Sequence, residues 1–319
     1  MKPLRVVVAG AGDLGPFWAR EVLLGGDTEL VGWADVDVAR ARAAAEAAGL
    51  DGLPTAAAVG PLVEALEPDF VINVTPPGAH HAVTLDALAH GAHVLSEKPM
   101  ATSMAEALEM IDAAERAERR FAVSQNRRYM PELVAFREQV EALGPLTSVT
   151  CEFFRHHKVP HAEFLLTFPQ PLLLDMAIHL FDGVRAITGA DPLTVYCESY
   201  DPPWSWFAGP AAATAIFEMS GGLRFTFVGN WAAPTDETSW TGAWHVVGEH
   251  GIATWDGEEA NERDPKRFQG LEGSLADFVT ALRTGRAPQG ECHDNLRSLA
   301  MCHAAVESAA LGVRVPVPG

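Results

Sequence analysis

The feature that most constrains the fold is a glycine-rich turn at residues 10–15 (GAGDLG), which follows the apolar run 5–9 and precedes a stretch with helical spacing. In this context Gly10 permits a tight turn, Gly12 lets the backbone approach a pyrophosphate, and Gly15 lets a helix pack closely on the strand. The start of that helix would face the phosphates. The pattern predicts a dinucleotide site, and the alternative is a glycine turn without a ligand.

Apolar runs alternate with stretches of helical spacing over the first part of the chain. The apolar runs are 5–9, 29–34, 70–73, 92–96 and 121–124, and the helical stretches are 14–24, 38–48, 61–66, 80–90 and 104–119. Strict alternation predicts an α/β fold with a doubly wound parallel sheet. We expect residues 1–124 to form a Rossmann dinucleotide-binding domain.

Asp35 stands 20 residues after Gly15, at the end of the second apolar run. An acid in this place can accept hydrogen bonds from the adenosine ribose hydroxyls of NAD. It would repel the 2'-phosphate of NADP, since at ~4 Å and an effective dielectric constant near 20 each charge pair costs about 4 kcal/mol. We therefore predict NAD rather than NADP. Arg40 and Arg42 follow closely and would favour a phosphate if they faced it, and surface positions on a helix are the alternative for both.

Ligands of parallel sheets bind beyond the carboxyl ends of the strands, so the loops at 73–80 and 97–99 stand out. The prolines of the first loop force an extended backbone, from which Thr75 and His80 can point polar groups at the cofactor. The second loop is Glu97-Lys98-Pro99. A surface ion pair before a turn is the alternative there, and the place at the ligand edge favours a functional role.

Together these motifs resemble the Gfo/Idh/MocA family, which includes glucose-fructose oxidoreductase and inositol dehydrogenase. The resemblance rests on the turn 10–15, Asp35, the T-P-P-x-x-H motif at 75–80, the run 93–99 (HVLSEKP) and the segment 126–131 (NRRYMP). It implies a second domain over residues 125–319, with a large, open, mostly antiparallel sheet, that binds substrate and mediates oligomerisation.

The same resemblance implies individual roles. Lys98 touches the substrate, Glu97 lies beside the nicotinamide, and Asn126 contacts the cofactor. The predicted cofactor contacts are Gly10, Gly12, Asp13, Leu14, Gly15, Asp35, Thr75, Pro76, His80, Glu97, Lys98 and Asn126.

The second half has the pattern of a helix, a series of strands and two closing helices. The helix is expected at 132–143, the strands at 146–154, 193–200, 212–218, 223–230, 244–248 and 252–255, and the closing helices near 275–283 and 296–310. Turn signals such as Ser220-Gly221-Gly222 separate the strands and indicate antiparallel pairing.

The apolar segment 172–185 carries three polar side chains, Asp175, His179 and Asp182, whose spacing of four and three residues places them on one helical face. A carboxylate beside an imidazole can orient and tune a base, and a structural pair satisfied in the core is the alternative. The family pattern Asp-x-Gly-x-His-x-x-Asp implies that Asp175 and His179 are catalytic. Two departures are Ala177 in place of the family glycine and Phe168-Pro169-Gln170-Pro171 before the helix.

Net charge, apolar runs and cysteine spacing exclude several classes of protein. A net charge of -19 opposes binding to nucleic acid or anionic membranes. No apolar run is long enough for a membrane span or a signal peptide, so we expect a cytoplasmic protein. The four cysteines are scattered as isolated reduced thiols, and no metal site is expected; for the histidines His156, His157 and His161 a substrate loop is favoured over zinc. The tryptophans of the second half are expected in the core or at an interface rather than stacked on sugars.

The function predicted from these residues is NAD-dependent oxidation of a secondary alcohol on a sugar, cyclitol or related polyol, by a homodimer or homotetramer. His179 would act as general base, Asp175 would orient it, and Lys98 would hydrogen-bond the reacting oxygen. Two alternatives remain: a glycosidase or lyase that uses bound NAD for transient oxidation, and a non-catalytic sensor that binds a dinucleotide.

Overall fold

The computed structural model describes residues 2–156, 168–258 and 270–319. The chain divides into two compact units, each built from two segments. The first unit comprises Met1–Tyr129 and Arg263–Leu296, and the second comprises Met130–Glu262 and Arg297–Gly319.

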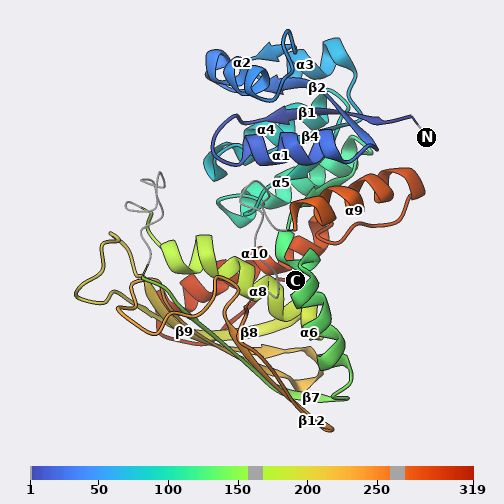
Figure 1. Cartoon of the computed structure of the whole chain (residues 1–319). Coiled ribbons are helices and arrows are strands. Elements are labelled where there is room, and N and C mark those ends of the chain that lie inside the picture. The colour runs from blue at the N-terminus through green and yellow to red at the C-terminus, as the bar shows by residue number, and fades with distance from the viewer. Residues whose placement is uncertain (1, 157–167, 259–269) are drawn as a thin grey trace. The chain divides into compact units, whose positions relative to one another are not determined.

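The first unit contains a six-stranded sheet with the order β3-β2-β1-β4-β5-β6, in which every neighbouring pair is parallel (Figure 1). The strands are β1 (Leu4–Ala9), β2 (Thr28–Ala34), β3 (Thr55–Ala56), β4 (Phe70–Asn73), β5 (His93–Ser96) and β6 (Phe121–Val123). The predicted doubly wound parallel sheet is confirmed. Only the two-residue strand β3 was not predicted.

Five helices connect these strands: α1 (Gly15–Leu24), α2 (Val38–Ala47), α3 (Val59–Leu66), α4 (Pro77–Ala89) and α5 (Met104–Arg116). Local sequence explains several of their first residues. Asp37 accepts hydrogen bonds from the amides of Ala39 and Arg40, and Ser103 accepts one from the amide of Glu106. Helices α1 and α4 instead begin with a proline in the first turn, where the missing N–H costs nothing.

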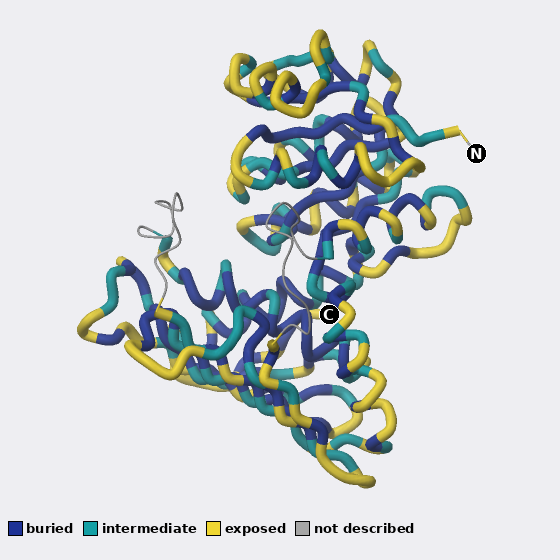
Figure 2. Tube along the Cα trace, in the orientation of Figure 1, coloured by how far each residue is buried: buried dark blue, intermediate teal, exposed yellow. Residues whose placement is uncertain are grey.

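The core of the first unit draws on both of its segments. The strands at its centre are mostly buried (Figure 2), and Val6, Val7 and Val8 of β1 have no exposed surface. Helix α9 (Leu271–Thr284), far later in the sequence, packs on the same core, where the rings of Phe278 and Phe70 meet edge to face at 5.4 Å. The first unit therefore needs a helix from the last sixth of the chain.

The second unit contains a seven-stranded sheet with the order β12-β11-β7-β10-β9-β8-β13. The central pair of β7 and β10 is parallel and the other neighbouring pairs are antiparallel, which confirms the predicted mostly antiparallel sheet. The strands are β7 (Leu146–Phe154), β8 (Pro192–Tyr200), β9 (Ala212–Met219), β10 (Arg224–Asn230), β11 (Ala243–Gly248), β12 (Gly251–Trp255) and β13 (Val315–Pro316).

The helices of the second unit include α6 (Pro131–Glu141), a π-helical turn η2 (Pro171–Met176) and α8 (Ala177–Thr188), which continues directly from η2. Helix α8 packs through Phe181, whose ring lies 4.9 Å from that of Phe217 and 5.3 Å from that of Phe227. Helix α10 (Cys292–Leu311) begins in the first unit and ends in the second.

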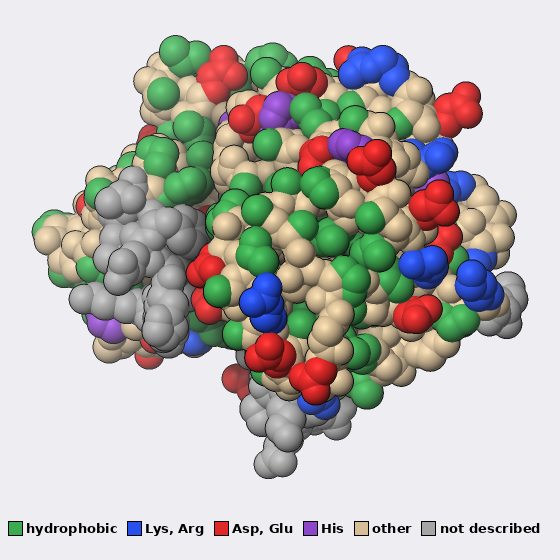
Figure 3. Space-filling view, turned by 90° about the horizontal axis from the view of Figure 1, so that it is seen from above, with side chains coloured by type: hydrophobic (Ala, Val, Ile, Leu, Met, Phe, Trp, Pro, Cys, Tyr) green, Lys and Arg blue, Asp and Glu red, His purple; other side chains and the backbone are tan. Residues whose placement is uncertain are grey.

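The surface in Figure 3 carries Asp and Glu side chains scattered among Lys, Arg and neutral residues. On this face the acidic excess is therefore spread out rather than gathered into one patch. Within the described ranges, every helix is too short or too polar to cross a lipid bilayer.

Candidate active site

The glycine turn joins β1 to α1 and is held against two neighbouring strands. Gly10 has a φ of +109°, and a Cβ there would lie 2.7 Å from the carbonyl oxygen of Val74. The Gly10 carbonyl accepts a hydrogen bond from Trp33 Nε1 at 2.9 Å. Both the backbone conformation and the close approach therefore require glycine at this position.

Gly15 and Gly12 differ in what surrounds them. A Cβ on Gly15 would lie 2.5 Å from the Gly10 carbonyl oxygen, so α1 could not pack as closely on the turn with any other residue. A Cβ on Gly12 would meet nothing within 4 Å, and Gly12 and Asp13 are exposed, while Leu14 is half-buried before α1. The open space beside Gly12 fits a pyrophosphate that approaches the backbone.

Asp35 lies at the carboxyl end of β2 with its side chain almost fully buried. Its Oδ2 accepts from the amide of Ala11 at 2.7 Å, its Oδ1 accepts from the amide of Asp37 at 2.9 Å, and Arg40 Nη2 lies 2.7 Å from Oδ1. Burial alone would raise the pKa of Asp35, but the hydrogen bonds from Arg40, Ala11 and Asp37 bring it below its ordinary value. The carboxylate is therefore charged and fixed beside the glycine turn, as recognition of ribose hydroxyls requires.

The loop after β4 is organised by Asn73, a fully buried residue for which no role was predicted from the sequence. Its Nδ2 donates to the His80 carbonyl at 3.0 Å and its Oδ1 accepts from the Thr75 hydroxyl at 2.7 Å. An amide at the end of an otherwise apolar strand was the available signal. The Thr75 hydroxyl is thereby directed at the loop itself, and Pro76 is exposed just before α4.

His80 is buried, and its two ring nitrogens both face backbone carbonyls. Nδ1 lies 2.7 Å from the Pro99 oxygen and Nε2 lies 2.8 Å from the Thr75 oxygen. Burial lowers the pKa of His80, while the hydrogen bonds to the Pro99 and Thr75 carbonyls act in the opposite direction. His80 thus links the loop after β4 to the residue after Lys98, and its contact with a cofactor stays a prediction.

The Glu97-Lys98-Pro99 loop follows β5 and is anchored from inside the unit. Glu97 is buried, its Oε1 accepts from Trp18 Nε1 of α1 at 2.8 Å, and its Oε2 accepts from the amide of Lys98 at 3.1 Å. Burial raises the pKa of Glu97, against the opposing effects of the Trp18 hydrogen bond and the Lys98 charge. Lys98 is half-buried and reaches the carboxyl edge of the sheet on this fixed backbone.

The segment after β6 forms the short helix η1 (Asn126–Tyr129). Asn126 is buried and lies against Gly270, where a Cβ would lie less than 2 Å from the Asn126 carbonyl oxygen. Arg128 Nη1 lies 2.9 Å from Asp294 Oδ2, and the Tyr129 hydroxyl donates to Asp277 at 2.8 Å. These residues of the NRRY motif therefore attach Asn126 to α9 and the start of α10.

In the second unit, the three polar residues of the segment 172–185 separate into two environments. Asp175, in the π-helical turn, and His179, in α8, are half-buried. Asp182 is buried and its Oδ1 accepts from the Ser298 hydroxyl at 2.7 Å. Ser298 in turn accepts from Arg185 at 2.9 Å, so Asp182 belongs to an internal hydrogen-bond network and only Asp175 and His179 are left as candidates for chemistry.

Aromatic side chains cluster near the end of β7. Trp231 is buried, and its ring centroid lies 5.3 Å from that of Phe207 and 6.3 Å from that of Trp240. The Arg155 guanidinium carbon lies 4.7 Å from the centroid of the Trp240 ring. Trp244 is also buried, as expected for most of the tryptophans, whereas Trp204 is exposed. His156 packs edge to face on Trp206, while His157 and His161 lie outside the described residues.

Comparison with known families covers both units. Residues 4–125 match the oxidoreductase family with an NAD-binding Rossmann fold, and residues 135–254 match the GFO/IDH/MocA C-terminal domain. The two matches account for most of the chain and confirm both the family resemblance and the prediction of NAD as cofactor.

Individual relatives agree with these matches. The rhizopine catabolism protein MocA of Rhizobium meliloti is 30% identical over 96% of this chain and 95% of its own length, and inositol 2-dehydrogenase 4 of Saccharopolyspora erythraea is 28% identical over 99% and 96%. The crystal structure of an oxidoreductase from Agrobacterium radiobacter shares the fold, with a TM-score of 0.90 at 20% identity over 99% of both chains. The chain therefore belongs to the Gfo/Idh/MocA family of NAD-binding oxidoreductases.

Proposed function

We propose that this protein is an NAD-dependent dehydrogenase that oxidises a secondary alcohol of a sugar, cyclitol or related polyol. The observation that carries the proposal is the set of groups at the carboxyl edge of the parallel sheet: the open turn at Gly12, the charged Asp35 and the anchored Lys98. The relatives of this chain include inositol 2-dehydrogenases and a D-glucoside 3-dehydrogenase, which supports the substrate class.

The cofactor half of the proposal concerns the first unit, with residues 1–124 as its main part. The turn 10–15 binds the pyrophosphate, Asp35 accepts the ribose hydroxyls, and Asn126 contacts the cofactor from η1. Bound NAD supplies the nicotinamide ring that accepts a hydride. Thr75, Pro76, His80 and Glu97 complete this part of the site, with Glu97 beside the nicotinamide.

In the substrate part of the proposal, His179 accepts the proton of the substrate hydroxyl. A neutral imidazole takes the hydroxyl proton as the carbon gives up hydride, and Asp175 orients that imidazole or binds a neighbouring hydroxyl. Lys98 donates to the reacting oxygen and stabilises the alkoxide that develops there. The second unit, which makes up most of the predicted domain 125–319, would thus carry substrate binding and oligomerisation.

We further propose a cytoplasmic homodimer or homotetramer, joined through the open sheet of the second unit. Exposed apolar side chains on its strands, such as Leu193, Ile216 and Ile252, support an interface there. Light scattering coupled to size exclusion measures the mass directly, and a monomer at micromolar concentration would contradict this part of the proposal.

The test of the activity is a screen of polyols and sugars for NADH formation, with Lys98→Ala as the blank. Replacing Lys98 by Ala or His179 by Asn should lower turnover by ~100-fold or more while NAD binding stays nearly unchanged. The matched controls are Lys2→Ala and His245→Asn, both at exposed positions. Unchanged turnover in both test variants would remove the assignment.

The same screen separates the two alternative functions. A glycosidase or lyase with transient oxidation would form product without accumulating NADH. A dinucleotide sensor would bind NAD and turn over no substrate, and the presence of Lys98, Asp175 and His179 in this chain argues against it.

A further inference from the structure

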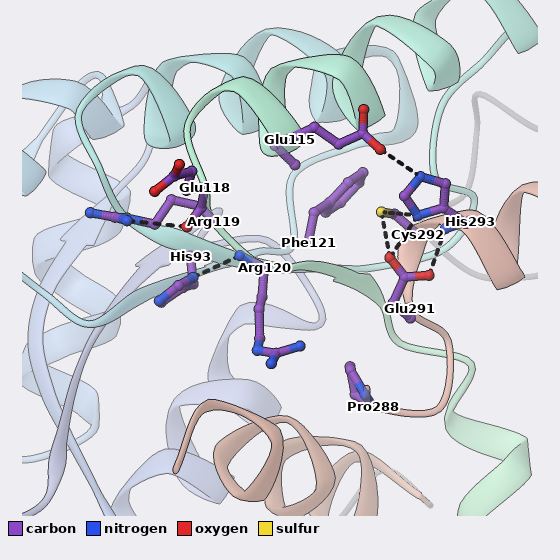
Figure 4. Close-up of a pocket in the computed structure, with 11 residues that line it drawn as sticks. His93, Glu115, Glu118, Arg119, Arg120, Phe121, Pro288, Glu291, Cys292 and His293 are labelled. Carbon is purple, nitrogen blue, oxygen red and sulfur yellow. Dashed lines mark hydrogen bonds and ion pairs between the residues drawn. The ribbon is translucent and has the colours of Figure 1, made fainter. Parts of the chain in front are cut away.

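A second group of reactive side chains lies in the first unit, away from the residues assigned to cofactor and substrate. Glu291, Cys292 and His293 follow one another at the start of α10 and line a cavity of about 360 Å³ (Figure 4). Neighbouring residues on a helix do not normally face each other. Here they converge because Glu291 precedes the helix and its carboxylate turns back toward the other two side chains.

The three donor atoms lie close enough to share one metal ion. Cys292 Sγ lies 2.9 Å from Glu291 Oε1 and 3.5 Å from His293 Nδ1, and His293 Nδ1 lies 2.9 Å from Glu291 Oε1. Tetrahedral zinc with bonds of ~2.0–2.3 Å places its sulfur, nitrogen and oxygen ligands about 3.3–3.6 Å apart. The sulfur and nitrogen already have this separation, and the carboxylate oxygen needs to move by only about half an ångström.

Glu115 of α5 supplies the outer partner that metal-bound histidines usually have. Its Oε1 lies 3.0 Å from His293 Nε2, on the side of the ring opposite to the three donors. Without a metal, both ring nitrogens face carboxylate oxygens as donors; with an ion bound, a proton on Nε2 would be donated to Glu115 and the Nδ1 lone pair would bind the ion. This arrangement of carboxylate, histidine and metal orients the ring and increases its basicity as a ligand.

The backbone that carries the cluster is fixed. Gly290, with a φ of +79°, lets the chain turn so closely on β6 that a Cβ there would lie 2.3 Å from the Val123 carbonyl oxygen. The Val123 amide donates to the Gly290 carbonyl at 2.8 Å, and the His293 amide donates to Glu291 Oε2 at 3.0 Å. One carboxylate oxygen of Glu291 therefore caps the helix, while the other is directed at the cluster.

The basic residues that line the same cavity keep their positive charge, but their side chains donate to backbone oxygens rather than to the cluster. Arg119 donates to the carbonyls of Gly91, Ala117 and Glu118, and Arg120 Nη2 donates to the carbonyl of Gly285. The guanidinium groups are thus held by backbone oxygens. His93, which also lines the cavity, accepts a hydrogen bond from the Arg120 amide at 2.7 Å.

The order Cys292, His293, Glu115 would also suit a thiol nucleophile activated by a histidine. The Glu291 carboxylate argues against that use, because it lies 2.9 Å from the sulfur and would repel a thiolate. A divalent cation removes this repulsion, since it binds thiolate and carboxylate together. Sulfur and imidazole donors favour zinc among the common divalent ions, over magnesium or calcium.

We propose that Glu291, Cys292 and His293 bind one zinc ion, with Glu115 as the outer partner of His293 and the fourth position open to the cavity. The spacing of the cysteines along the sequence did not predict this site, because its three ligands are consecutive residues. The ion would connect α5, through Glu115, to the start of α10.

Cobalt(II) substitution tests the proposal independently of catalysis. The full-length protein is treated with a chelator, dialysed and titrated with Co²⁺. We expect a thiolate-to-cobalt charge-transfer band in the near ultraviolet and intense visible bands of tetrahedral cobalt, both saturating at one ion per chain and both lost when Zn²⁺ is added.

Variants assign the ligands. Cys292→Ser should abolish the charge-transfer band, and Cys302→Ser, in the same helix, should leave it unchanged. Glu115→Gln should weaken Zn²⁺ binding by ~10–100-fold, and Glu118→Gln, which lines the same cavity, should not. The exposed His293→Gln gives a second test of zinc binding by calorimetry if Cys292→Ser does not fold.

Two results would overturn the proposal. One is the absence of any saturable cobalt band in the wild-type protein, which would leave the cluster as a hydrogen-bonded helix cap. The other is zinc affinity that is equal in the wild type and in His293→Gln.

Discussion

Arg40 Nη2 lies 2.7 Å from Asp35 Oδ1, and the two side chains differ greatly in exposure, with 50% of Arg40 but only 5% of Asp35 open to solvent. The carboxylate is thus fixed and charged, and the guanidinium lies beside it at the surface. A 2'-phosphate would meet the charge of Asp35, while Arg40 alone would attract it. The pair therefore contains both a determinant for NAD and a latent one for NADP.

Replacing Asp35 by Ser should shift the ratio of kcat/KM for NADP over NAD by at least ~10-fold toward NADP. The substitution removes a repulsion of roughly 4 kcal/mol, of which Arg40 already offsets a part, and it frees Arg40 for the phosphate. Steady-state kinetics with both cofactors measure the ratio. Adding Arg40→Gln to the variant should reverse the gain, and an unchanged ratio in Asp35→Ser would contradict this account.

Gly12 and Gly15 offer a matched pair of alanine substitutions. Gly15→Ala should lower the free energy of unfolding by about 1–3 kcal/mol, because its Cβ would press on the Gly10 carbonyl oxygen. Gly12→Ala should change stability by less than ~1 kcal/mol but weaken NAD binding by ~10-fold or more, since its Cβ would occupy the space left for the pyrophosphate. Urea denaturation and calorimetric titration with NAD separate the two effects. A Gly12→Ala variant with unchanged NAD affinity would show that the pyrophosphate lies elsewhere.

Trp18→Phe should make stability more dependent on pH. Burial raises the pKa of Glu97 above its ordinary value of 4.5, so the unfolded chain loses this proton first and the free energy of unfolding falls as the pH rises from about 4.5 to the raised pKa. Without the Trp18 hydrogen bond that pKa rises further, and the substitution should cost about 1–3 kcal/mol more at pH 8 than at pH 5.

Urea unfolding at the two pH values provides the measurement for Trp18→Phe. The control is the double variant with Glu97→Gln, in which the difference between pH 5 and pH 8 should disappear because no carboxylate titrates at this site. A Trp18→Phe effect that is the same at both pH values would mean that the hydrogen bond does not stabilise the charged form of Glu97.

Asp175 and Asp182 should respond differently to replacement by Ala. Asp182→Ala should reduce the free energy of unfolding by about 1–3 kcal/mol, because the buried Ser298 hydroxyl loses its acceptor. Asp175→Ala should leave stability within ~1 kcal/mol and lower turnover by ~10-fold or more. Thermal unfolding and activity assays on both variants measure the two effects. A loss of stability in Asp175→Ala and a loss of turnover in Asp182→Ala would mean that Asp175 is structural and Asp182 is catalytic.

Sequence pattern predicted most of the elements because their apolar residues have clear periodicity. Strand β7 was predicted with its observed bounds, and α2 and α5 with their observed first residues. The first residue of α4 was placed at His80 rather than Pro77, since a proline read as a breaker is also well suited to a first helical turn. Strand β3 has only two residues, Thr55 and Ala56, and so has no periodicity to detect.

The candidate site was harder to predict from the sequence than the fold. Spacing placed Asp175, His179 and Asp182 on one face, but the partner that distinguishes Asp182, Ser298, is 116 residues away. The π-helical turn before α8 also rotates its side chains relative to those of α8, and a prediction based on 3.6 residues per turn does not include this rotation. Asn73 holds the loop after β4 and Trp18 of α1 binds Glu97, and neither contact can be predicted from local sequence patterns.

Helix α9 has a consequence for the order in which the molecule is made. Its Phe278 covers Phe70 of the parallel sheet, so the strands of the first unit are synthesised some two hundred residues before the helix that completes their core. During translation the nascent sheet exposes an apolar surface until the first segment of the second unit, Met130–Glu262, and then α9 have emerged from the ribosome. A fragment that stops at residue 129 should therefore aggregate, and the first unit can reach its final state only after translation has passed α9.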